Sequence, residues 1–350
     1  MANFERRDRL AREAEEAQRL GPAATRSADS RGRLQPEEPD EFRTAFERDR
    51  DRILHSKAFR RLKHKTQVFI NPDGDHFITR LSHTLQVTQI SRSIAAALSL
   101  NESLSEAIAL GHDVGHSPFG HTGEVALSPY FPGSGWHHAA QSVRIFDVLE
   151  HLNLSWEVRD GIRAHSWKIE PPPSTPEAMT VRYGDRIAYL THDALDAMRA
   201  GVLSPDDFPV RALDRFGPPG RTWIDEMISA VVEESLRTGD VRMDSPTLEV
   251  MTELRTFMFE RVYLSPEQRV HTEPAIALIH RLVDYHLDHP DELPDSYRDP
   301  DADITTQVVD QVAGMTDRYA VFVDERLFGP QKPDSQLALI GSTGTAARID

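Results

Sequence analysis

Histidine and aspartate side chains are concentrated in one short stretch of the sequence. His112, Asp113, His116 and His121 fall within ten residues, inside the glycine-containing segment 111–124. Imidazole together with carboxylate suits Mn, Fe, Co, Ni or Zn, and carboxylate with water suits Mg. This density of potential ligands between glycines is unusual in a core helix. The stretch is therefore a candidate metal site.

Two more potential ligands lie on flanking helices. His83 is about 30 residues before His112 on an apolar helix, and Asp185 is on a later helix beside Ile187 and other apolar residues. A helical hairpin would bring His83 beside His112, and a buried carboxylate at Asp185 would be costly unless it were paired or metal-bound. Alone, His83 could be a core histidine and Asp185 an exposed or ion-paired residue, but the ordered set is more specific. Together with Asp113, these residues would leave metal positions open for water and substrate.

The elements that must position these residues are helices. Apolar residues recur at helical spacing over 80–100, and the next helical stretch, 102–110, has Asn101 as a plausible N-cap. Further helices are expected over 138–152, 155–165, 177–199, 223–236, 246–263, 272–287 and 305–328, whereas the proline-rich segments 171–176 and 205–219 predict connections. Period-2 patterns are scarce, with at most a short β-hairpin near 66–78. The predicted class is therefore all-α.

Composition suggests how the chain is organised. Residues 1–40 are polar and expected to be mostly disordered or loosely helical, and 41–203 form the densest region, a catalytic core. Residues 204–328 predict a C-terminal helical region packed on that core, and 329–350 a flexible tail.

Charge and cysteine content exclude several classes of protein. The absence of Cys rules out disulfides, zinc–thiolate sites and cysteine catalysis, and it favours a cytoplasmic setting. No apolar stretch reaches the ~18 residues of a membrane span, and the charged N-terminus predicts no secretory signal. The net charge of −16 argues against wholesale wrapping of DNA.

One segment is basic in this acidic chain. Residues 43–65 carry nine Lys or Arg against three Asp or Glu, a net of +6. This segment could hold a small anionic ligand, or it could be a solvated basic helix face, and charge alone leaves both interpretations open.

The ordered set His83, His112-Asp113 and Asp185 resembles the metal-binding signature of the HD-domain superfamily of metal-dependent phosphohydrolases. The wider sequence is similar to the deoxyguanosinetriphosphate triphosphohydrolase-like (dNTPase) family. The likeness is carried by Phe42–Phe69, Arg80–Leu85, Ser117–Glu124 and Asp185–Asp193, and it is strong over about 40–200. The fold implied is an HD-domain helical bundle with additional C-terminal helices.

The resemblance implies hydrolysis of a deoxynucleoside triphosphate to deoxynucleoside and tripolyphosphate. His83, His112, Asp113 and Asp185 would hold a divalent metal ion such as Mn, Mg, Co or Fe, which would lower the pKa of a bound water. The sugar alkoxide is a poor leaving group and needs a proton.

Four residues are implied to act at the reacting bond. By resemblance, His121 would be the general acid to the 5′ oxygen, and Glu124, three residues on, could orient its ring if the segment is helical. His116 and His138 would contact phosphate or metal-bound water, with indirect supporting roles as the alternative. His121 could instead merely cap a loop near Pro118 and Gly120.

The resemblance also implies substrate contacts. Arg80, on the same helix face as His83, would bind the α-phosphate, and Arg186 the outer phosphates. Arg60, Arg61, Lys63 and Lys65 could add positive potential, with a solvated or subunit-interface face as the alternative.

The sugar would be recognised along one helix. Tyr189 would exclude a ribose 2′-hydroxyl or, alternatively, be ordinary core packing, and Asp193 and Gln67 would bind the 3′-hydroxyl. Asp185, Tyr189 and Asp193 recur every four residues and so share one stripe of a helix. No residue that reads the base is identified.

The family implies further partners. Its members form homo-oligomers, hexamers or tetramers, and some respond to a nucleotide activator or bind single-stranded DNA, here expected to be weak. Competing interpretations are another HD-domain phosphohydrolase (a 5′-deoxynucleotidase, or a cyclic-dinucleotide or guanosine-tetraphosphate hydrolase) and a nucleotide-sensing HD protein. The basic segment with Arg80 and Arg186 favours a triphosphate, and the complete ligand set argues against a sensor.

Overall fold

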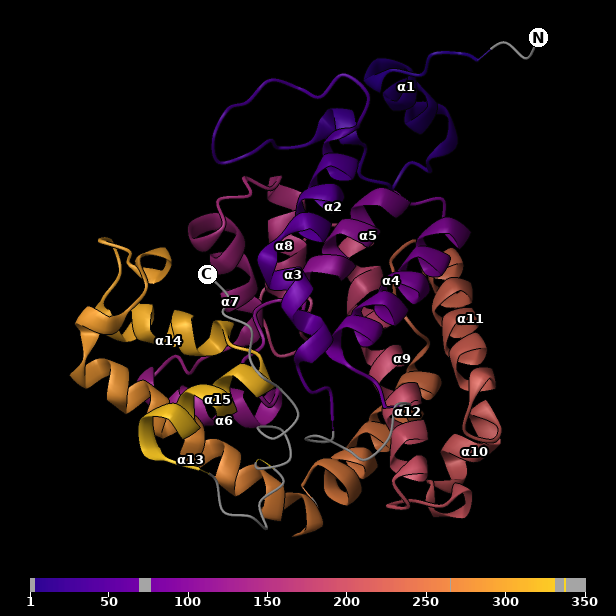
Figure 1. Cartoon of the computed structure of the whole chain (residues 1–350). Coiled ribbons are helices and arrows are strands. Elements are labelled where there is room, and N and C mark those ends of the chain that lie inside the picture. The colour runs from indigo at the N-terminus through magenta and orange to yellow at the C-terminus, as the bar shows by residue number, and fades with distance from the viewer. Residues whose placement is uncertain (1–3, 69–76, 265, 331–336, 338–350) are drawn as a thin grey trace.

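The computed structural model describes residues 4–68, 77–264, 266–330 and 337, with the side chains of 266–271 excepted. These residues form fifteen α-helices and no β-strand (Figure 1), which confirms the all-α prediction. Thr66 and Thr79 make a single antiparallel bridge, and the turn of the expected hairpin, 69–76, lies outside the described residues.

Five helices form the centre of the molecule. α4 (Arg80–Ala97) packs against α5 (Glu102–Gly111) and α9 (Pro176–Arg199), while α2 (Ala45–His55) and α8 (Trp156–Ala164) cover α5. Local sequence sets where they begin. Asn101 caps α5 by accepting from the Ser103 and Leu104 amides, as predicted, and Thr175 caps α9 ahead of Pro176.

The remaining helices surround this centre. They are α1 (Arg9–Arg19), α3 (Lys57–Arg61), α6 (His121–Leu127), α7 (His138–Arg144), α10 (Val210–Phe216), α11 (Arg221–Thr238), α12 (Ser245–Met258), α13 (Pro266–Asp288), α14 (Ile304–Gly314) and α15 (Asp317–Phe328). One apolar cluster joins the central helices to α10, α11 and α12, and a second joins α6 to α13, α14 and α15. Because both clusters cross residue 203, the division into a core and a C-terminal region stays a prediction.

Several boundaries differ from expectation. The segment 205–219 contains α10, and the helices expected over 138–152 and 246–263 each end in a π-helical turn, Ile145–Leu149 and Phe259–Tyr263. The single helix expected over 305–328 is two helices, since Met315 is extended and Thr316 caps α15 by accepting from the Tyr319 amide. A side-chain cap of this kind starts a new helix and breaks the periodic pattern.

The N-terminal segment is more structured than expected. α1 forms, and its buried Glu16 accepts hydrogen bonds from the Ser27 amide and hydroxyl at 2.8 and 2.9 Å. Glu177 of α9 accepts from the Thr25 amide and hydroxyl. Polar contacts with distant carboxylates order this segment, and its own composition could not reveal them. The expected flexible tail, 329–350, lies mostly outside the described residues.

Candidate active site

One cavity of about 600 Å³ opens between α4, α6, α7 and α9. Its wall includes all but one of the candidate metal-binding, catalytic and phosphate- or sugar-binding residues outside the basic segment, namely Gln67, Arg80, His83, Asp113, His116, His121, Glu124, His138, Asp185, Arg186, Tyr189 and Asp193. The exception, His112, is fully buried directly behind Asp113. The structure therefore brings these thirteen residues together.

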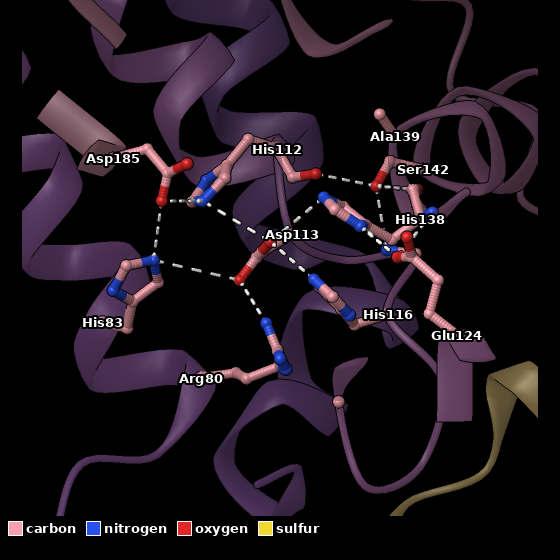
Figure 2. Close-up of polar contacts among 12 residues, drawn as sticks. Arg80, His83, His112, Asp113, His116, Glu124, His138, Ala139, Ser142 and Asp185 are labelled. Carbon is pink, nitrogen blue, oxygen red and sulfur yellow. Dashed lines mark hydrogen bonds and ion pairs between the residues drawn. The ribbon is translucent and has the colours of Figure 1, made fainter. Parts of the chain in front are cut away.

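The four predicted metal ligands meet at one end of this cavity (Figure 2). His83 Nε2 lies 3.2 Å from Asp185 Oδ1 and 4.0 Å from Asp113 Oδ2. His112 Nε2 lies 3.6 Å from Asp113 Oδ1 and 3.9 Å from Asp185 Oδ1. The helical hairpin of α4 and α5 produces the predicted neighbours, and α9 adds the second carboxylate.

The hydrogen bonding of His112 fits a metal ligand. Its Nδ1 lies 2.6 Å from the carbonyl oxygen of Ala109, which can only accept, so Nδ1 carries the proton and Nε2 carries a lone pair. This Nε2 is buried and has no hydrogen-bond partner, although two carboxylates face it. A buried lone pair beside carboxylate oxygens is suited to a divalent cation.

The carboxylates are ionised despite their burial. Burial alone would raise the pKa of Asp113, but the charge of Arg80 and the hydrogen bond with His116 hold it well below its usual range. Burial likewise opposes ionisation of Asp185, and the hydrogen bond from His83 lowers its pKa on balance.

Arg80 presents unsatisfied positive charge to the cavity. Its Nη1 donates to Asp113 Oδ2 at 2.7 Å, whereas Nε and Nη2 are buried and have no partner. The side chain is only 1% exposed. Buried guanidinium donors without partners are costly, so this arrangement favours an anionic group in the adjoining space.

Glycines allow the histidine-bearing loop to approach its neighbours. A Cβ on Gly115 would lie 2.3 Å from both the carbonyl oxygen of His138 and the amide of Ser142. Gly120 has φ of +59°, and a Cβ there would lie 2.5 Å from Nη2 of Arg80. Only glycine fits both positions, which explains the glycines among the potential ligands.

The remaining histidines lie on the opposite side of Asp113. His116 Nε2 is 3.3 Å from Asp113 Oδ1, and the His116 and His138 rings stack with centroids 3.8 Å apart. Burial lowers the pKa of His116 and His138 well below the usual value, so both rings are neutral near pH 7. His121 is exposed at the cavity wall, where desolvation and the charge of Arg80 lower its pKa.

Glu124 has a different partner from the one expected. Its segment is helical, as α6, but its Oε2 accepts a 2.6 Å hydrogen bond from Nδ1 of His138 rather than orienting His121. The connection after α6 brings His138, the first residue of α7, to the Glu124 carboxylate, which a spacing of three residues within one helix does not reveal.

The stripe on α9 lies along the cavity as predicted. Tyr189 is half-buried, and burial raises its pKa to about 12, so it is a neutral phenol. Asp193 is buried and accepts from the hydroxyl of Tyr263, while its Oδ1 has no partner. Burial raises the pKa of Asp193 well above its usual value, so its carboxyl can also donate a hydrogen bond.

Two other predicted contacts also have free polar groups. Arg186 stacks on the indole of Trp167, with 3.9 Å between its guanidinium carbon and the ring centroid, and its buried Nε has no partner. Gln67 Oε1 is likewise buried without a partner. Both side chains are placed to receive a ligand.

The basic segment does not line the cavity. Arg60 and Lys63 are exposed, and Arg61 donates to the carbonyl oxygen of Gly314 at 3.1 Å. Lys65 is buried and donates to the carbonyl oxygens of His116 and Ala313. These four residues therefore do not contact the cavity directly, and Lys65 supports the loop, whereas an added positive potential from them stays a prediction.

Sequence reasoning missed other residues of the cavity. His165, Trp167, Arg255 and Tyr263 all line it. His165 ends the helix expected over 155–165, so a histidine at a helix terminus was the available signal. Arg255 and Tyr263 come from a helix far along the chain, and no local pattern points to them.

Comparisons with known proteins identify the family of the chain. The HD domain model matches residues 80–190, and a phosphohydrolase-associated domain model matches residues 241–326. A deoxyguanosinetriphosphate triphosphohydrolase-like protein of Caldanaerobacter subterraneus subsp. tengcongensis is 46% identical over 318 residues, 89% of this chain and 93% of that protein. Proteins with the same description from Desulfatibacillum aliphaticivorans and Clostridium perfringens (strain 13 / Type A) are 44% and 42% identical, each over 89% of this chain and 95% of their own length.

One solved structure is also similar. It is a hypothetical protein from Aquifex aeolicus with a TM-score of 0.45 and 22% identity, over 80% of this chain and 71% of that one.

In the described residues, none of the helices has the length and apolar character needed to cross a membrane.

Proposed function

The chain belongs to the HD-domain deoxyguanosinetriphosphate triphosphohydrolase-like family, a family of hydrolases, and from that premise we propose that it hydrolyses deoxynucleoside triphosphates to deoxynucleoside and tripolyphosphate. The observation that carries the proposal is the buried, partly unpartnered guanidinium of Arg80 beside four potential metal ligands. This combination suits a phosphoryl group held between a cation and an arginine.

The metal ligands define where the reaction occurs. A divalent ion on His83, His112, Asp113 and Asp185, proposed to be Mn, Mg, Co or Fe, would polarise a phosphoryl oxygen and lower the pKa of a bound water. Arg80 donates to Asp113 and keeps two further nitrogens for the α-phosphate. Arg186, stacked on Trp167, supplies positive charge for the outer phosphates.

His121 is the proposed general acid. Its ring stands at the cavity wall, where its imidazole N–H can give a proton to the departing 5′ oxygen. Its pKa is lowered, so it is less protonated than an ordinary histidine near pH 7. The negative charge of a bound triphosphate would raise that pKa toward the working range. His116 and His138, held by Asp113 and Glu124, complete the polar wall around the reacting phosphate.

The sugar would lie along α9. Tyr189 offers an apolar ring face against C2′, where a 2′-hydroxyl would lose its hydration without gaining a partner. Oδ1 of Asp193 and Oε1 of Gln67 are buried and unpartnered, so both can bind the 3′-hydroxyl.

Product analysis tests the proposal. The purified chain is incubated with each dNTP and rNTP and with Mn, Mg or Co singly, and nucleoside is separated from nucleotides. We expect deoxynucleoside and tripolyphosphate, and we expect Asp113→Ala to abolish turnover while exposed Asp295→Ala does not. Monophosphate or diphosphate products would instead identify another HD-domain phosphohydrolase, and an Asp113→Ala variant with full activity would contradict the metal site.

Assembly and regulation are part of the same proposal. We expect a cytoplasmic homo-oligomer, a hexamer or tetramer of the 39.5 kDa chain, which light scattering after size exclusion would measure. If the protein hydrolyses no single dNTP but does hydrolyse dNTPs in a mixture, one of the nucleotides acts as an activator. Binding of single-stranded DNA should be weak and should fall as salt rises.

A further inference from the structure

His137 stands at a position where a histidine is unexpected. It directly precedes α7, and its Nδ1 accepts a hydrogen bond from the Ala139 amide at 3.1 Å, which makes it the N-cap of that helix. Ser, Thr, Asp and Asn are the residues that cap helices best. The cap by itself therefore does not explain a histidine here. The imidazole ring, which also lines the cavity, has a second set of contacts.

The cap fixes the protonation of this ring. A nitrogen that accepts from a backbone amide carries a lone pair, so Nδ1 of His137 is unprotonated, and the neutral ring keeps its proton on Nε2. Burial lowers the pKa of His137 in the same sense, although the nearby Glu124 carboxylate opposes it. His137 therefore presents a flat, uncharged face to its neighbours.

That face lies against the ring of His138. The two ring centroids are 4.4 Å apart and the planes are inclined by 28°. His138 also stacks on His116, with centroids 3.8 Å apart and planes inclined by 14°. Two rings so close to the face of a third would touch each other if they shared that face. No ring contact joins His116 and His137, both of which the structure describes, so His138 is held between them.

A hydrogen bond holds the edge of the same ring. Nδ1 of His138 donates to Oε2 of Glu124 at 2.6 Å (Figure 2). This bond fixes the rotation of the ring within its plane, whereas stacked rings on both faces fix the tilt of that plane. His138 is only 6% exposed, and the half-buried ring of His137 covers it on the side of the cavity. The orientation of His138 thus depends on His137 as well as on Glu124.

We propose that His137 is a positioning residue that acts through His138. Its ring completes a stack of three imidazoles and keeps water from the hydrogen bond between Glu124 and His138. His138 belongs to the polar wall around the reacting phosphate, so the consequence for turnover rests on the proposed function. The stack and its effect on the hydrogen bond do not.

Two variants separate the ring of His137 from its cap. His137→Asn keeps an acceptor for the Ala139 amide and removes the ring, whereas His137→Phe keeps a ring and removes the acceptor. In protein labelled with ¹⁵N-histidine, nuclear magnetic resonance follows the exchange of the His138 Nδ1 proton with water, and loss of the signal in His138→Gln identifies it. We expect exchange roughly 2- to 13-fold faster in His137→Asn, the loss of one aromatic pair, and unchanged exchange in His137→Phe.

A second histidine stack provides the control. His289 is exposed, stacks on Tyr285 with centroids 4.3 Å apart and does not line the cavity, so His289→Asn should leave this exchange unchanged. Wild-type exchange in His137→Asn would overturn the proposal. Equal acceleration in His137→Asn and His137→Phe would also overturn it, because the cap and not the ring would then protect the hydrogen bond.

Turnover gives an independent readout. His137→Asn should lower kcat for a dNTP roughly 10-fold or more with a smaller change in KM, because the phosphates still meet Arg80 and Arg186 while the wall beside the reacting bond is misplaced. His137→Phe should restore most of the lost kcat, and a change in KM alone would contradict the assignment. A wild type that hydrolyses no nucleotide would refute the proposed function and leave the proton exchange to test the stack.

Discussion

Asp317 is predicted to hold the active-site loop from outside the cavity. It is the first residue of α15, and its Oδ1 accepts from the Phe119 amide at 2.9 Å. Its Oδ2 accepts from the amide of Thr66 at 2.8 Å and from the Thr66 hydroxyl. Phe119 lies between His116 and His121, so one carboxylate connects the C-terminal helices to the segment that carries two site histidines.

The expected increase in local opening follows from the loss of one acceptor for the backbone amides of Thr66 and Phe119. In Asp317→Asn one carboxylate oxygen becomes an NH₂ group, which cannot accept, so either Thr66 or Phe119 loses its acceptor. A hydrogen bond to a charged group contributes about 1.5–3 kcal/mol, so local opening should become roughly 10- to 150-fold more frequent. Hydrogen exchange measured by mass spectrometry on peptides containing Thr66 and Phe119 reports this opening.

An exposed aspartate provides the control for Asp317→Asn. Asp295→Asn alters an exposed aspartate and should leave exchange in both peptides unchanged. We also expect Asp317→Asn to lower kcat more than it raises KM, because the loop loses its fixed position while the cavity persists. Protection within threefold of the wild type in both peptides would refute the claim that Asp317 restrains this loop.

Three further changes test the site. Burial lowers the pKa of Lys65 to about 7, against roughly 10.4 when unfolded, so the folded chain releases this proton first. Between those two pKa values, the free energy of unfolding of the wild type should rise with pH relative to that of Lys65→Met by up to about 1.4 kcal/mol per pH unit. Urea unfolding at pH 7, 8 and 9 measures both proteins, and the same pH dependence in both would contradict this. Trp167→Leu should raise KM for a triphosphate roughly 2- to 30-fold by removing a cation–π contact, whereas Trp156→Leu, which removes an equally close stack on a different arginine, should leave KM unchanged. Tyr189→Ala should lower the ratio of kcat/KM for dNTP over NTP, and an unchanged ratio would remove its role in sugar selection.

The metal ligands could be predicted from sequence because their positions depend on local features. Helical periodicity places His83 on the apolar face of α4, and the Asn101 cap fixes where α5 begins, so a hairpin brings His83 beside His112. Asp185 follows from the same logic on α9. The break between α14 and α15 was missed because capping by Thr316 interrupts a pattern that continues in sequence.

The pairings within the site could not be predicted in this way. Glu124 meets His138 and Asp193 meets Tyr263 through contacts between different elements, 14 and 70 residues apart in sequence. The basic segment shows the same limit. Its charge is evident from composition, but Lys65 is used to bind backbone carbonyls, a role that charge counting cannot distinguish from anion binding.

Helix ends supply several of the cationic and imidazole groups in this cavity or directly behind it. They lie at the first residue of a helix or directly after its last, in Arg80 of α4, His112 of α5, His121 of α6, His138 of α7 and His165 of α8. The last carbonyls of a helix lack partners within it, and the Nδ1–H of a histidine at that point can satisfy one of them. The bond that completes the end of α5 or α8 therefore also fixes which nitrogen of His112 or His165 carries a lone pair. The hydrogen bond that completes the end of α5 thus also orients His112, a proposed metal ligand, so a change that frays this helix end should weaken metal binding before it unfolds the chain.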